Sequence, residues 1–366
     1  MRNRILAGLL MTMTLAAQKR TVSDAEVKRV HASALLIDTH DDFPTEQGGN
    51  DRPSGTAIDI GVSSLKAHTD LARLREGGVG GVFFAAYVAA SYGLGPRAYE
   101  RGLEVIGTIH RLVDQYPKDF AFVTTAAQIE AAHKQGKIAA LIGVEGGHAI
   151  DDSLDKLREF YKRGARYMTL THTNTNHWAD SSGDINDTKV AHHNGLTDFG
   201  KDVVREMNRL GMMVDISHVA DKTFYDALAV SRAPLIASHS GCRALADVPR
   251  NMTDEMIVAV AKKGGVVQVN FYCNFLTTQK PPRATLDDVV AHIDHIRKIA
   301  GIDAIGIGSD FDGIDCVPVG LEDVSKYPNL TRALLEKGYS ASDIRKIYGG
   351  NLLRVMRAVE HVASAK

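Results

Sequence analysis

Short apolar runs recur eight times along this chain of 366 residues, and segments with helical periodicity fill the gaps between them. Most of the runs are continuously apolar rather than alternating, which is typical of strands buried on both faces of a parallel sheet. Strand followed by helix, eight times over, predicts an α/β fold of the (β/α)8 TIM-barrel type. The runs are Ala34–Ile37, Val79–Tyr87, Ile138–Val144, Tyr167–Thr171, Met212–Ile216, Pro234–Ser238, Gly265–Phe271 and Ala304–Gly308.

Several gaps between the runs place apolar residues at helical spacing. A doubly wound open sheet would alternate strands and helices in the same way, but it gathers only the strand ends at its switch point. A barrel gathers all of its strand ends around one mouth, and here polar residues follow many different runs. The glycine-rich stretch 77–81 precedes a strand, so we interpret it as a tight turn and not as a dinucleotide-binding motif. The predicted helices include Ser153–Tyr161, Asp198–Leu210, Asp254–Ala261, Leu286–Ile299 and Ser342–Val362.

Imidazoles and carboxylates follow most of the runs and should therefore meet at the mouth of the barrel. They are His40 and Asp42 after the first run, Glu145 after the third, His172 after the fourth, His218 after the fifth, His239 after the sixth and Asp310 after the eighth. Neutral imidazoles and carboxylates suit Zn²⁺. Two such ions about 3.5–4 Å apart can share a hydroxide and lower its pKa toward neutrality. The pattern therefore indicates a two-metal hydrolytic site, with glycines beside Glu145 allowing close approach of the backbone.

Each of these residues alone has a plainer interpretation. A single histidine can be a satisfied core residue, and Glu145 can be a carboxylate at the start of a helix. The metal hypothesis rests on agreement between separate strand ends. We interpret His148, His177, His192 and His193 as loop or supporting residues near the mouth, and His31, His68, His110, His133, His292, His295 and His361 as surface or packing residues. Cys242 could offer a thiolate, but the histidines and carboxylates already fill two sites.

Composition excludes some classes of function. Hydrophobic residues make up 44% and charged residues 24% of the chain, as in an ordinary globular protein, and the net charge of −1 gives no reason to expect a nucleic-acid or anionic-membrane surface. Long polar loops, 45–63 and 173–196, follow the first and fourth runs, where we expect substrate contacts. The three cysteines are too few for a disulfide framework, and one pair is possible but not assignable.

The N-terminus differs from the rest of the chain. Arg2 and Arg4 precede the apolar stretch 5–17, which ends in small residues and is too short to span a bilayer. This pattern predicts a signal peptide over residues 1–20 and export to the periplasm or outside the cell. The remaining residues, 21–366, are predicted to form one metal-dependent hydrolase barrel domain. A frayed apolar tail on a cytoplasmic protein is the alternative. The C-terminus carries no apolar tail, so we expect no GPI-type or transmembrane anchor in the mature chain.

The motifs together resemble one known family. The carrying segments are 37–42, 143–148, 170–172, 178–180, 232–234, 238–240, 250–251, 269–272, 308–313 and 320–328. They are similar to those of the membrane (renal-type) dipeptidases, the M19 metallopeptidases of the amidohydrolase superfamily. The resemblance runs from about residue 30 to about residue 360. The mammalian members carry disulfides and a lipid anchor, whereas this chain lacks the matching cysteines and the tail.

The resemblance implies a zinc dipeptidase, often tolerant of a D-residue at the C-terminal position, and commonly a homodimer. His40 and Asp42 would hold one of two Zn²⁺ ions, His218 and His239 the other, and Glu145 would bridge them. His172, Arg250 and Asp310 match the family's substrate-contacting and catalytic positions. Without the resemblance, Arg250 would be interpreted as half of a surface salt bridge.

The implied mechanism is attack of a bridging hydroxide on the scissile carbonyl. His172 would stabilise the oxyanion, Asp310 would transfer the proton to the leaving amine, and Arg250 would pair with the substrate's carboxylate. Alternatives on the same site are N-acyl-amino-acid, lactone or phosphotriester hydrolysis, or a metal-binding scaffold without activity.

Overall fold

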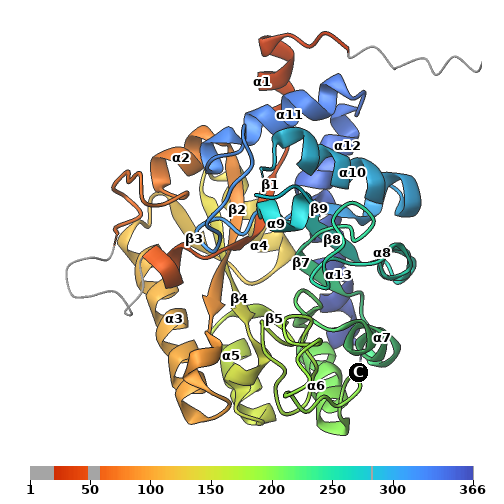
Figure 1. Ribbon diagram of the computed structural model, residues 1–366. Coiled ribbons are helices and arrows are strands. Elements are labelled where there is room, and N and C mark those ends of the chain that lie inside the picture. The colour runs from red at the N-terminus through yellow and green to blue at the C-terminus, as the bar shows by residue number, and fades with distance from the viewer. Residues whose placement is uncertain (1–19, 48–57, 282, 366) are drawn as a thin grey trace, which may run out of the picture.

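The computed structural model describes residues 20–47, 58–281 and 283–365. Its strands are all parallel, and eight of them follow one another in the order β1-β2-β4-β5-β6-β7-β8-β9. An isolated bridge between Asp41 and Phe311 joins the end of β1 to the segment after β9, so the barrel is nearly closed. Helices surround the strands on the outside (Figure 1). The predicted (β/α)8 barrel is confirmed.

The eight predicted runs correspond to eight observed strands. The strands are β1 (Leu36–Asp41), β2 (Val79–Tyr87), β4 (Ile138–Glu145), β5 (Ala165–Thr169), β6 (Met213–Asp215), β7 (Ile236–Ser240), β8 (Val266–Val269) and β9 (Ile305–Ile307). The sequence placed the first strand too early, because it followed only the apolar residues. β1 continues through His40 and Asp41, which are buried polar residues of the strand.

A further short strand, β3 (Phe120–Phe122), was not predicted. It pairs with Ile138–Ala140 at the start of β4, and β5 joins the same edge only from Ile142 onward. β3 therefore covers the part of that edge which β5 leaves open. Three residues are too few to produce a recognisable strand pattern, so only the fold reveals this strand.

Four of the five named helix predictions match observed helices closely, namely α5, α6, α8 and α10 in the following set. The observed helices are α1 (Asp24–Ala32), α2 (Leu71–Glu76), α3 (Pro96–Gln115), α4 (Ala126–Lys134), α5 (Leu154–Lys162), α6 (Asp198–Leu210), α7 (Asp221–Val230), α8 (Asp254–Lys262), α9 (Cys273–Leu276), α10 (Leu286–Ala300), α11 (Tyr327–Glu336), α12 (Ala341–Arg345) and α13 (Asn351–Ser364). The helix predicted over Ser342–Val362 is interrupted by a π-helical turn, Lys346–Gly350. A Cβ at Gly349 would lie 2.3 Å from the carbonyl oxygen of Leu35, so a glycine is needed where this turn meets the chain just before β1.

Local chemistry explains where the helices begin and end. The Thr197 side chain accepts a hydrogen bond from Gly200 N and caps α6, which ends at Gly211 in the left-handed conformation. Thr285 and Asp288 form a capping box at the start of α10. In α6 the side chains at helical spacing, such as Val203 and Met207, are buried. The apolar faces of the helices thus cover the outside of the barrel.

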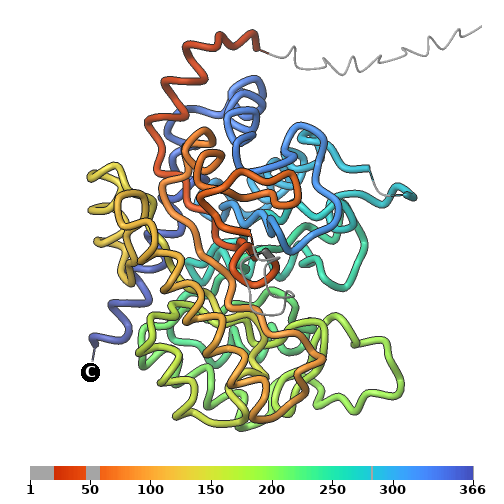
Figure 2. The backbone as a smooth tube through the Cα atoms, turned by 90° about the vertical axis from the view of Figure 1, so that its left-hand side faces the viewer, coloured from red at the N-terminus to blue at the C-terminus, as the bar shows by residue number. Residues whose placement is uncertain are grey.

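The first described helix and the C-terminal helix α13 end at opposite ends of the molecule (Figure 1). Helix α1 packs against α11, so the first described helix lies beside the C-terminal part of the chain, as Figures 1 and 2 both show. The turn before β2 has Gly78 at a φ of 65°, which confirms the tight turn predicted for the glycine-rich stretch. None of the helices in the described ranges is long and apolar enough to cross a membrane.

Candidate active site

His40, near the end of β1, is held in one orientation from behind. Its Nδ1 lies 2.8 Å from the hydroxyl of Tyr167, and that hydroxyl donates to the carbonyl of Thr39 at 3.0 Å. Because the phenolic hydrogen is given to Thr39, His40 must donate from Nδ1, and its Nε2 is the nitrogen that faces the site. This Nε2 is buried and has no hydrogen-bond partner among the described residues. A buried ring nitrogen without a hydrogen-bond partner is a position where a partner is expected.

The contact between Tyr167 and His40 depends on Gly143. Tyr167, on β5, is fully buried. A Cβ at Gly143, on β4, would lie 1.9 Å from Cζ of the Tyr167 ring. Glycine at this position therefore leaves the space through which the phenol reaches His40.

His239, on β7, is oriented in a similar way. Its Nδ1 lies 2.8 Å from Oγ of Ser238, which donates to the buried carboxylate of Asp215 at 2.6 Å. His239 therefore donates from Nδ1 and directs the lone pair of Nε2 toward the barrel mouth. Such backing hydrogen bonds are typical of metal-ligating histidines.

Two further predicted residues, His218 and Asp310, lie on loops in an uncommon backbone conformation. Their φ values are 66° and 68°, in the left-handed region that side chains other than glycine rarely adopt. Ser182 N donates to the carbonyl of His218 at 2.7 Å, which ties this residue to the loop after β5. Asn270 Nδ2 donates to Asp310 Oδ2 at 2.8 Å. Backbone of this kind persists only where surrounding contacts hold it.

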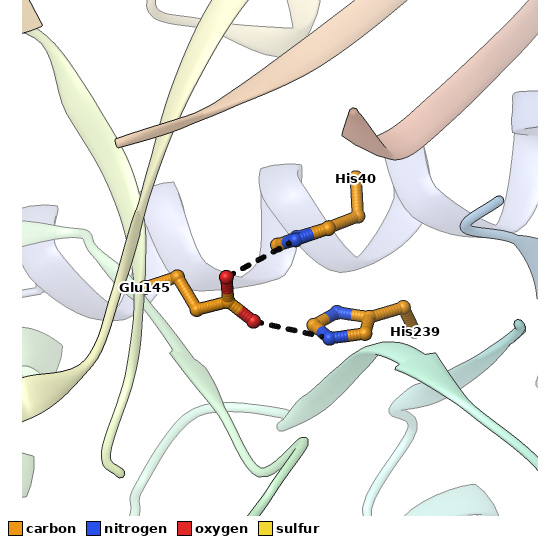
Figure 3. Close-up of side chains that lie close together, drawn as sticks. All are labelled: His40, Glu145 and His239. Atoms are coloured by element: carbon orange, nitrogen blue, oxygen red, sulfur yellow. Dashed lines mark ion pairs between the residues drawn. The ribbon is translucent and has the colours of Figure 1, made fainter. Parts of the chain in front are cut away.

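Glu145, at the end of β4, stands between two sets of side chains. Its Oε2 lies 3.4 Å from Nε2 of His40. Its Oε1 lies 3.0 Å from Nε2 of His218 and 3.2 Å from Nε2 of His239. Figure 3 shows the carboxylate between His40 and His239, one oxygen toward each ring.

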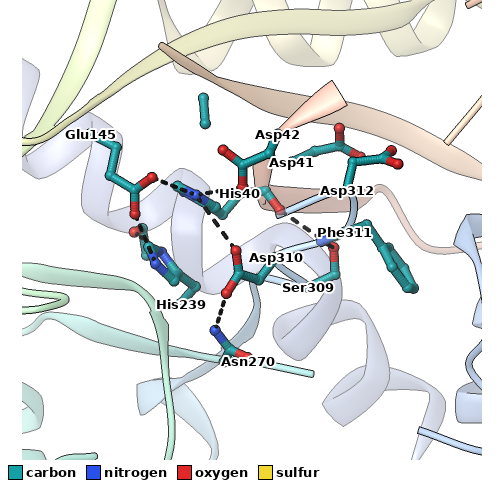
Figure 4. Close-up of polar contacts among 12 residues, drawn as sticks. His40, Asp41, Asp42, Glu145, His239, Asn270, Ser309, Asp310, Phe311 and Asp312 are labelled. Atoms are coloured by element: carbon teal, nitrogen blue, oxygen red, sulfur yellow. Dashed lines mark hydrogen bonds and ion pairs between the residues drawn. The ribbon is translucent and has the colours of Figure 1, made fainter. Parts of the chain in front are cut away.

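The residues around Glu145 form an acidic group and an imidazole group. The acidic group is His40, Asp42 and Asp310, in which His40 Nε2 lies 3.2 Å from Asp42 Oδ2 and 3.9 Å from Asp310 Oδ1 (Figure 4). The imidazole group is His218 and His239, whose Nε2 atoms are 3.0 Å apart. All five side chains converge on Glu145, as the strand ends predicted.

His172 and Arg250 lie at the edge of these groups. His172 Nε2 is 4.0 Å from Glu145 Oε1, and its ring packs against Tyr87 at a centroid distance of 4.6 Å. Arg250 donates from Nη1 to Ser240 Oγ at 2.8 Å and from Nη2 to the carbonyl of His239 at 2.7 Å. Its Nε is buried without a partner among the described residues. Arg250 thus lies at the site and not in a surface salt bridge.

Burial and crowding shift the pKa values of the carboxyls. Burial raises the pKa of Asp42 to about 6, and the charges of Glu145 and Glu46 add to this effect. Burial, together with Asp42 and Glu145, raises the pKa of Asp310 well above its usual value. Burial acts in the same direction on Glu145, but the surrounding imidazoles outweigh it and hold that pKa well below its usual value. Of the three carboxyls, Glu145 is therefore the one whose surroundings favour the ionised form.

The pKa values of the imidazoles are also shifted in opposite directions. Burial opposes protonation of His40, but the facing carboxylates of Glu145 and Asp42 outweigh it and raise the pKa of His40 well above its usual value. Burial lowers the pKa values of His218 and His239 well below the usual value, and the Arg250 charge adds to this. The surroundings of His218 and His239 thus favour the neutral imidazole, whereas those of His40 favour the protonated form.

The donor chemistry fits metal ions. Candidate metal-binding triplets with ligand atoms in close range are His40–Glu145–His239, Glu145–His172–His218 and His40–Asp42–Asp310. Two nitrogens bound to one tetrahedral zinc at about 2.05 Å would lie roughly 3.3 Å apart, close to the separation of His218 and His239. Two facing lone pairs at this separation repel each other unless a cation or a proton lies between them.

A cavity of about 560 Å³ gives access to the two groups. Its lining includes the aromatic residues Tyr87, Tyr272 and Phe275, which the sequence did not single out. The supporting residues Tyr167, Asp215, Ser238 and Asn270 were also missed as functional residues. Tyr167 and Asn270 contact residues distant in the sequence, and Asp215 contacts Ser238 on another strand, so no local motif marks these three. Ser238 adjoins its partner His239 in the segment 238–240, but that segment assigns it no role. Part of the predicted substrate loop 45–63 lies outside the described residues.

The other histidines and cysteines occupy different places. His148 is buried after β4, where burial lowers its pKa to about 4, and His177 pairs with Asp152 on the surface. Cys242 donates from Sγ to the carbonyl of His292 and takes no part in the candidate metal triplets. Cys273 and Cys316 form a disulfide, the pair that the sequence could not assign.

Comparison with known proteins agrees with this geometry. The model of the family described as membrane dipeptidase (peptidase family M19) matches residues 24–366. A metallo peptidase from Rhodobacter sphaeroides, solved with a phosphinate mimic of the dipeptide L-Ala-D-Ala, is 28% identical, with a TM-score of 0.79 and coverage of 89% of this chain and 99% of that chain. Dipeptidase AC, a metallo peptidase of family M19, is 28% identical, with a TM-score of 0.79 and coverage of 89% and 98%.

The probable dipeptidase PvdM from Pseudomonas aeruginosa is 24% identical, with a TM-score of 0.80 and coverage of 93% of this chain and 98% of that chain, and it supports the fold alone. The family match spans nearly the whole chain, including every strand that carries a candidate ligand. The chain therefore belongs to the membrane dipeptidase family, peptidase family M19, and is a metallo-dipeptidase.

Proposed function

We propose that the chain hydrolyses dipeptides at a binuclear zinc site. The observation that carries this proposal is the placement of Glu145, whose two oxygens face different ligand groups. His40 and Asp42 would hold one ion, His218 and His239 would hold the other, and the Glu145 carboxylate would serve both. When bound, the ions supply an activated water and polarise the scissile carbonyl.

Asp310 is the proton carrier in this proposal. It accepts a proton from the attacking water and returns it to the leaving amine. Its raised pKa suits a carboxyl that must hold a proton near neutral pH, and Asn270 fixes its orientation. His172 reaches the cavity beside Glu145, where an imidazole N–H can stabilise the negative charge that develops on the carbonyl oxygen.

Arg250 recognises the substrate's C-terminal carboxylate. Its guanidinium already holds the carbonyl of His239, so its position relative to the imidazole group is fixed. Its buried Nε has no partner, and a carboxylate would supply the missing acceptor. A planar fork of donors matches the two oxygens of a carboxylate.

The test of Arg250 compares L-Ala-L-Ala with its C-terminal amide. Arg250→Ala should lower kcat/KM about 100-fold for the free dipeptide, the scale expected when one partner of a buried charge pair is truncated, and change it little for the amide. Arg158→Ala, on α5 and paired with Glu206, is the matched control and should leave both rates unchanged. Equal losses on both substrates would contradict the carboxylate role.

Zinc and the tolerance of a D-residue are tested together. The solved relative that carries a mimic of L-Ala-D-Ala motivates the comparison of L-Ala-L-Ala with L-Ala-D-Ala. The protein stripped by a chelator should be inactive and should recover with two equivalents of Zn²⁺. Recovery at one equivalent, or greater recovery with another divalent ion, would contradict the binuclear zinc assignment. N-acyl-amino-acid, lactone and phosphotriester substrates complete the panel.

We further propose export and a homodimer. The disulfide between Cys273 and Cys316 supports export, because structural disulfides persist mainly in oxidising compartments. The predicted signal peptide over residues 1–20 falls almost entirely outside the described residues. Cell fractionation with the intact mass of the exported chain tests the signal peptide, and sedimentation tests the dimer.

A further inference from the structure

Arg243, in the loop after β7, holds the backbone on both sides of Arg250. Its Nε donates to the carbonyl of Asn251 at 2.9 Å, and its Nη2 donates to the carbonyl of Pro249 at 3.1 Å. The same guanidinium donates from Nη1 and Nη2 to the two oxygens of Asp221, each at 2.7 Å. One side chain therefore fixes both neighbours of Arg250.

Asp221 connects this contact to the imidazole group. It is the first residue of α7 and follows His218 by only three positions. A bidentate arginine–carboxylate pair is directional, so Asp221 also fixes the plane of the Arg243 fork. The segment that carries Arg250 is thereby tied to the segment that carries His218.

The ion pair between Asp221 and Arg243 is partly exposed, which bears on whether it positions the loop or stabilises the fold. The Asp221 side chain is 45% exposed and the Arg243 side chain is 20% exposed. Both border a second cavity of about 520 Å³, which shares no lining residue with the cavity of the metal groups. Partly exposed ion pairs contribute little to the free energy of unfolding. The contribution of the Asp221–Arg243 pair is therefore expected in the position of the loop and not in the free energy of unfolding.

Arg250 needs such support because it lies in a loop. Residues 241–253, between β7 and α8, form neither strand nor helix. Their backbone is held by an isolated bridge between Cys242 and Met252 and by turn hydrogen bonds such as that from Asn251 N to the carbonyl of Val248. A misplacement of about 1 Å in a substrate-positioning group can cost roughly 100-fold in rate. A fork that must meet both oxygens of a carboxylate tolerates little displacement.

We propose that Arg243, oriented by Asp221, is a positioning residue that places Arg250 for recognition of the substrate's C-terminal carboxylate. This inference rests on the proposed role of Arg250. It assigns the Arg243 fork to substrate affinity and not to the chemical step. A lysine at position 243 keeps the charge but cannot reach two carbonyls and a carboxylate at once.

The experiment measures KM and kcat for L-Ala-L-Ala and its C-terminal amide in Arg243→Lys and Asp221→Asn, with Arg250→Ala in parallel. Arg243→Lys should raise KM for the dipeptide about tenfold with kcat within about twofold, since binding and not the chemical step is lost. Asp221→Asn should act in the same direction by about threefold, and the amide should be affected little by either change. Arg158→Lys, the same change at an arginine pair between α5 and α6, should leave KM unchanged.

Thermal unfolding and bound-metal content check that each variant remains folded and loaded. An unchanged KM in both Arg243→Lys and Asp221→Asn, while Arg250→Ala still discriminates dipeptide from amide, would overturn this inference and leave the proposed function standing. A fall in kcat on both substrates would overturn it too, because Arg243 would then act on the metal groups. Failure of Arg250→Ala to discriminate would overturn the role of Arg250 itself.

Discussion

The acidic group and the imidazole group differ in what must happen before a cation can bind. In the imidazole group, burial lowers the pKa values of His218 and His239, so a cation displaces little positive charge when it binds there. In the acidic group, His40 holds a proton with a raised pKa, and the pKa of Asp42 is raised to about 6. Ligand atoms of similar spacing can thus make one site that is prepared for a cation and another that must first release protons.

The largest effect is expected at Glu145, the residue that the two groups share. Glu145→Gln should lower kcat/KM by about 10³-fold or more, because changes to mere supporting residues of metal sites already cost roughly 10–100-fold. Glu159→Gln, the same change in a surface pair on α5, should have no effect. Steady-state kinetics with metal analysis measures both. Retention of activity with full metal content would show that Glu145 does not join the groups.

The pH dependence of zinc affinity should separate the groups. In Asp42→Ala, which leaves the imidazole group, affinity should be nearly constant between pH 5.5 and 8, because His218 and His239 have lowered pKa values and are already neutral. In His239→Ala, which leaves the acidic group, affinity should fall about tenfold per pH unit for each proton that the metal displaces.

The sign follows from the raised pKa values of His40 and Asp42. Protons compete with the cation at His40 throughout neutral pH and at Asp42 below about pH 6, so affinity decreases as the pH falls. Equilibrium dialysis against buffered zinc measures both variants. Equal slopes in the two variants would contradict the difference between the groups.

The smallest effect on zinc affinity is expected from the two hydroxyls that accept hydrogen bonds from the histidines. Tyr167→Phe removes the hydroxyl that accepts from His40, and Ser238→Ala removes the one that accepts from His239. Each should weaken zinc at its own group about tenfold, the lower end for supporting residues, and leave the other group unchanged. Zinc titration of the two variants tests this. If Tyr167→Phe weakened both groups equally, the two groups would not be independent.

The strand-borne part of this site was predictable from sequence, and the supporting part was not. His40, Glu145 and His239 belong to strands whose apolar residues mark them, and the barrel brings strand ends together regardless of loop detail. Tyr167 is 127 residues from His40, and nothing near Tyr167 in the sequence indicates which ring it supports. Contacts between residues so far apart in the sequence can be identified only from the folded barrel.

Functional residues on loops could be predicted from the sequence only in part. The sequence placed His218 and Asp310 at strand ends, but it could not predict their positive φ angles, which depend on contacts such as that of Asn270 with Asp310. Arg250 has no strand to mark it, and only the resemblance to the dipeptidase family distinguished it from a surface arginine. The missed strand β3 had the weakest signal, because its pattern lasts three residues.

The phenol of Tyr167 belongs both to the packed interior of the barrel and to the candidate metal site. It fills the space above Gly143 while its oxygen sets the tautomer of His40. Substitutions that repack the interior of the barrel to raise its thermal stability would therefore also change the affinity of the site for a metal ion. In this protein, thermostability and cofactor retention should evolve together at that ring.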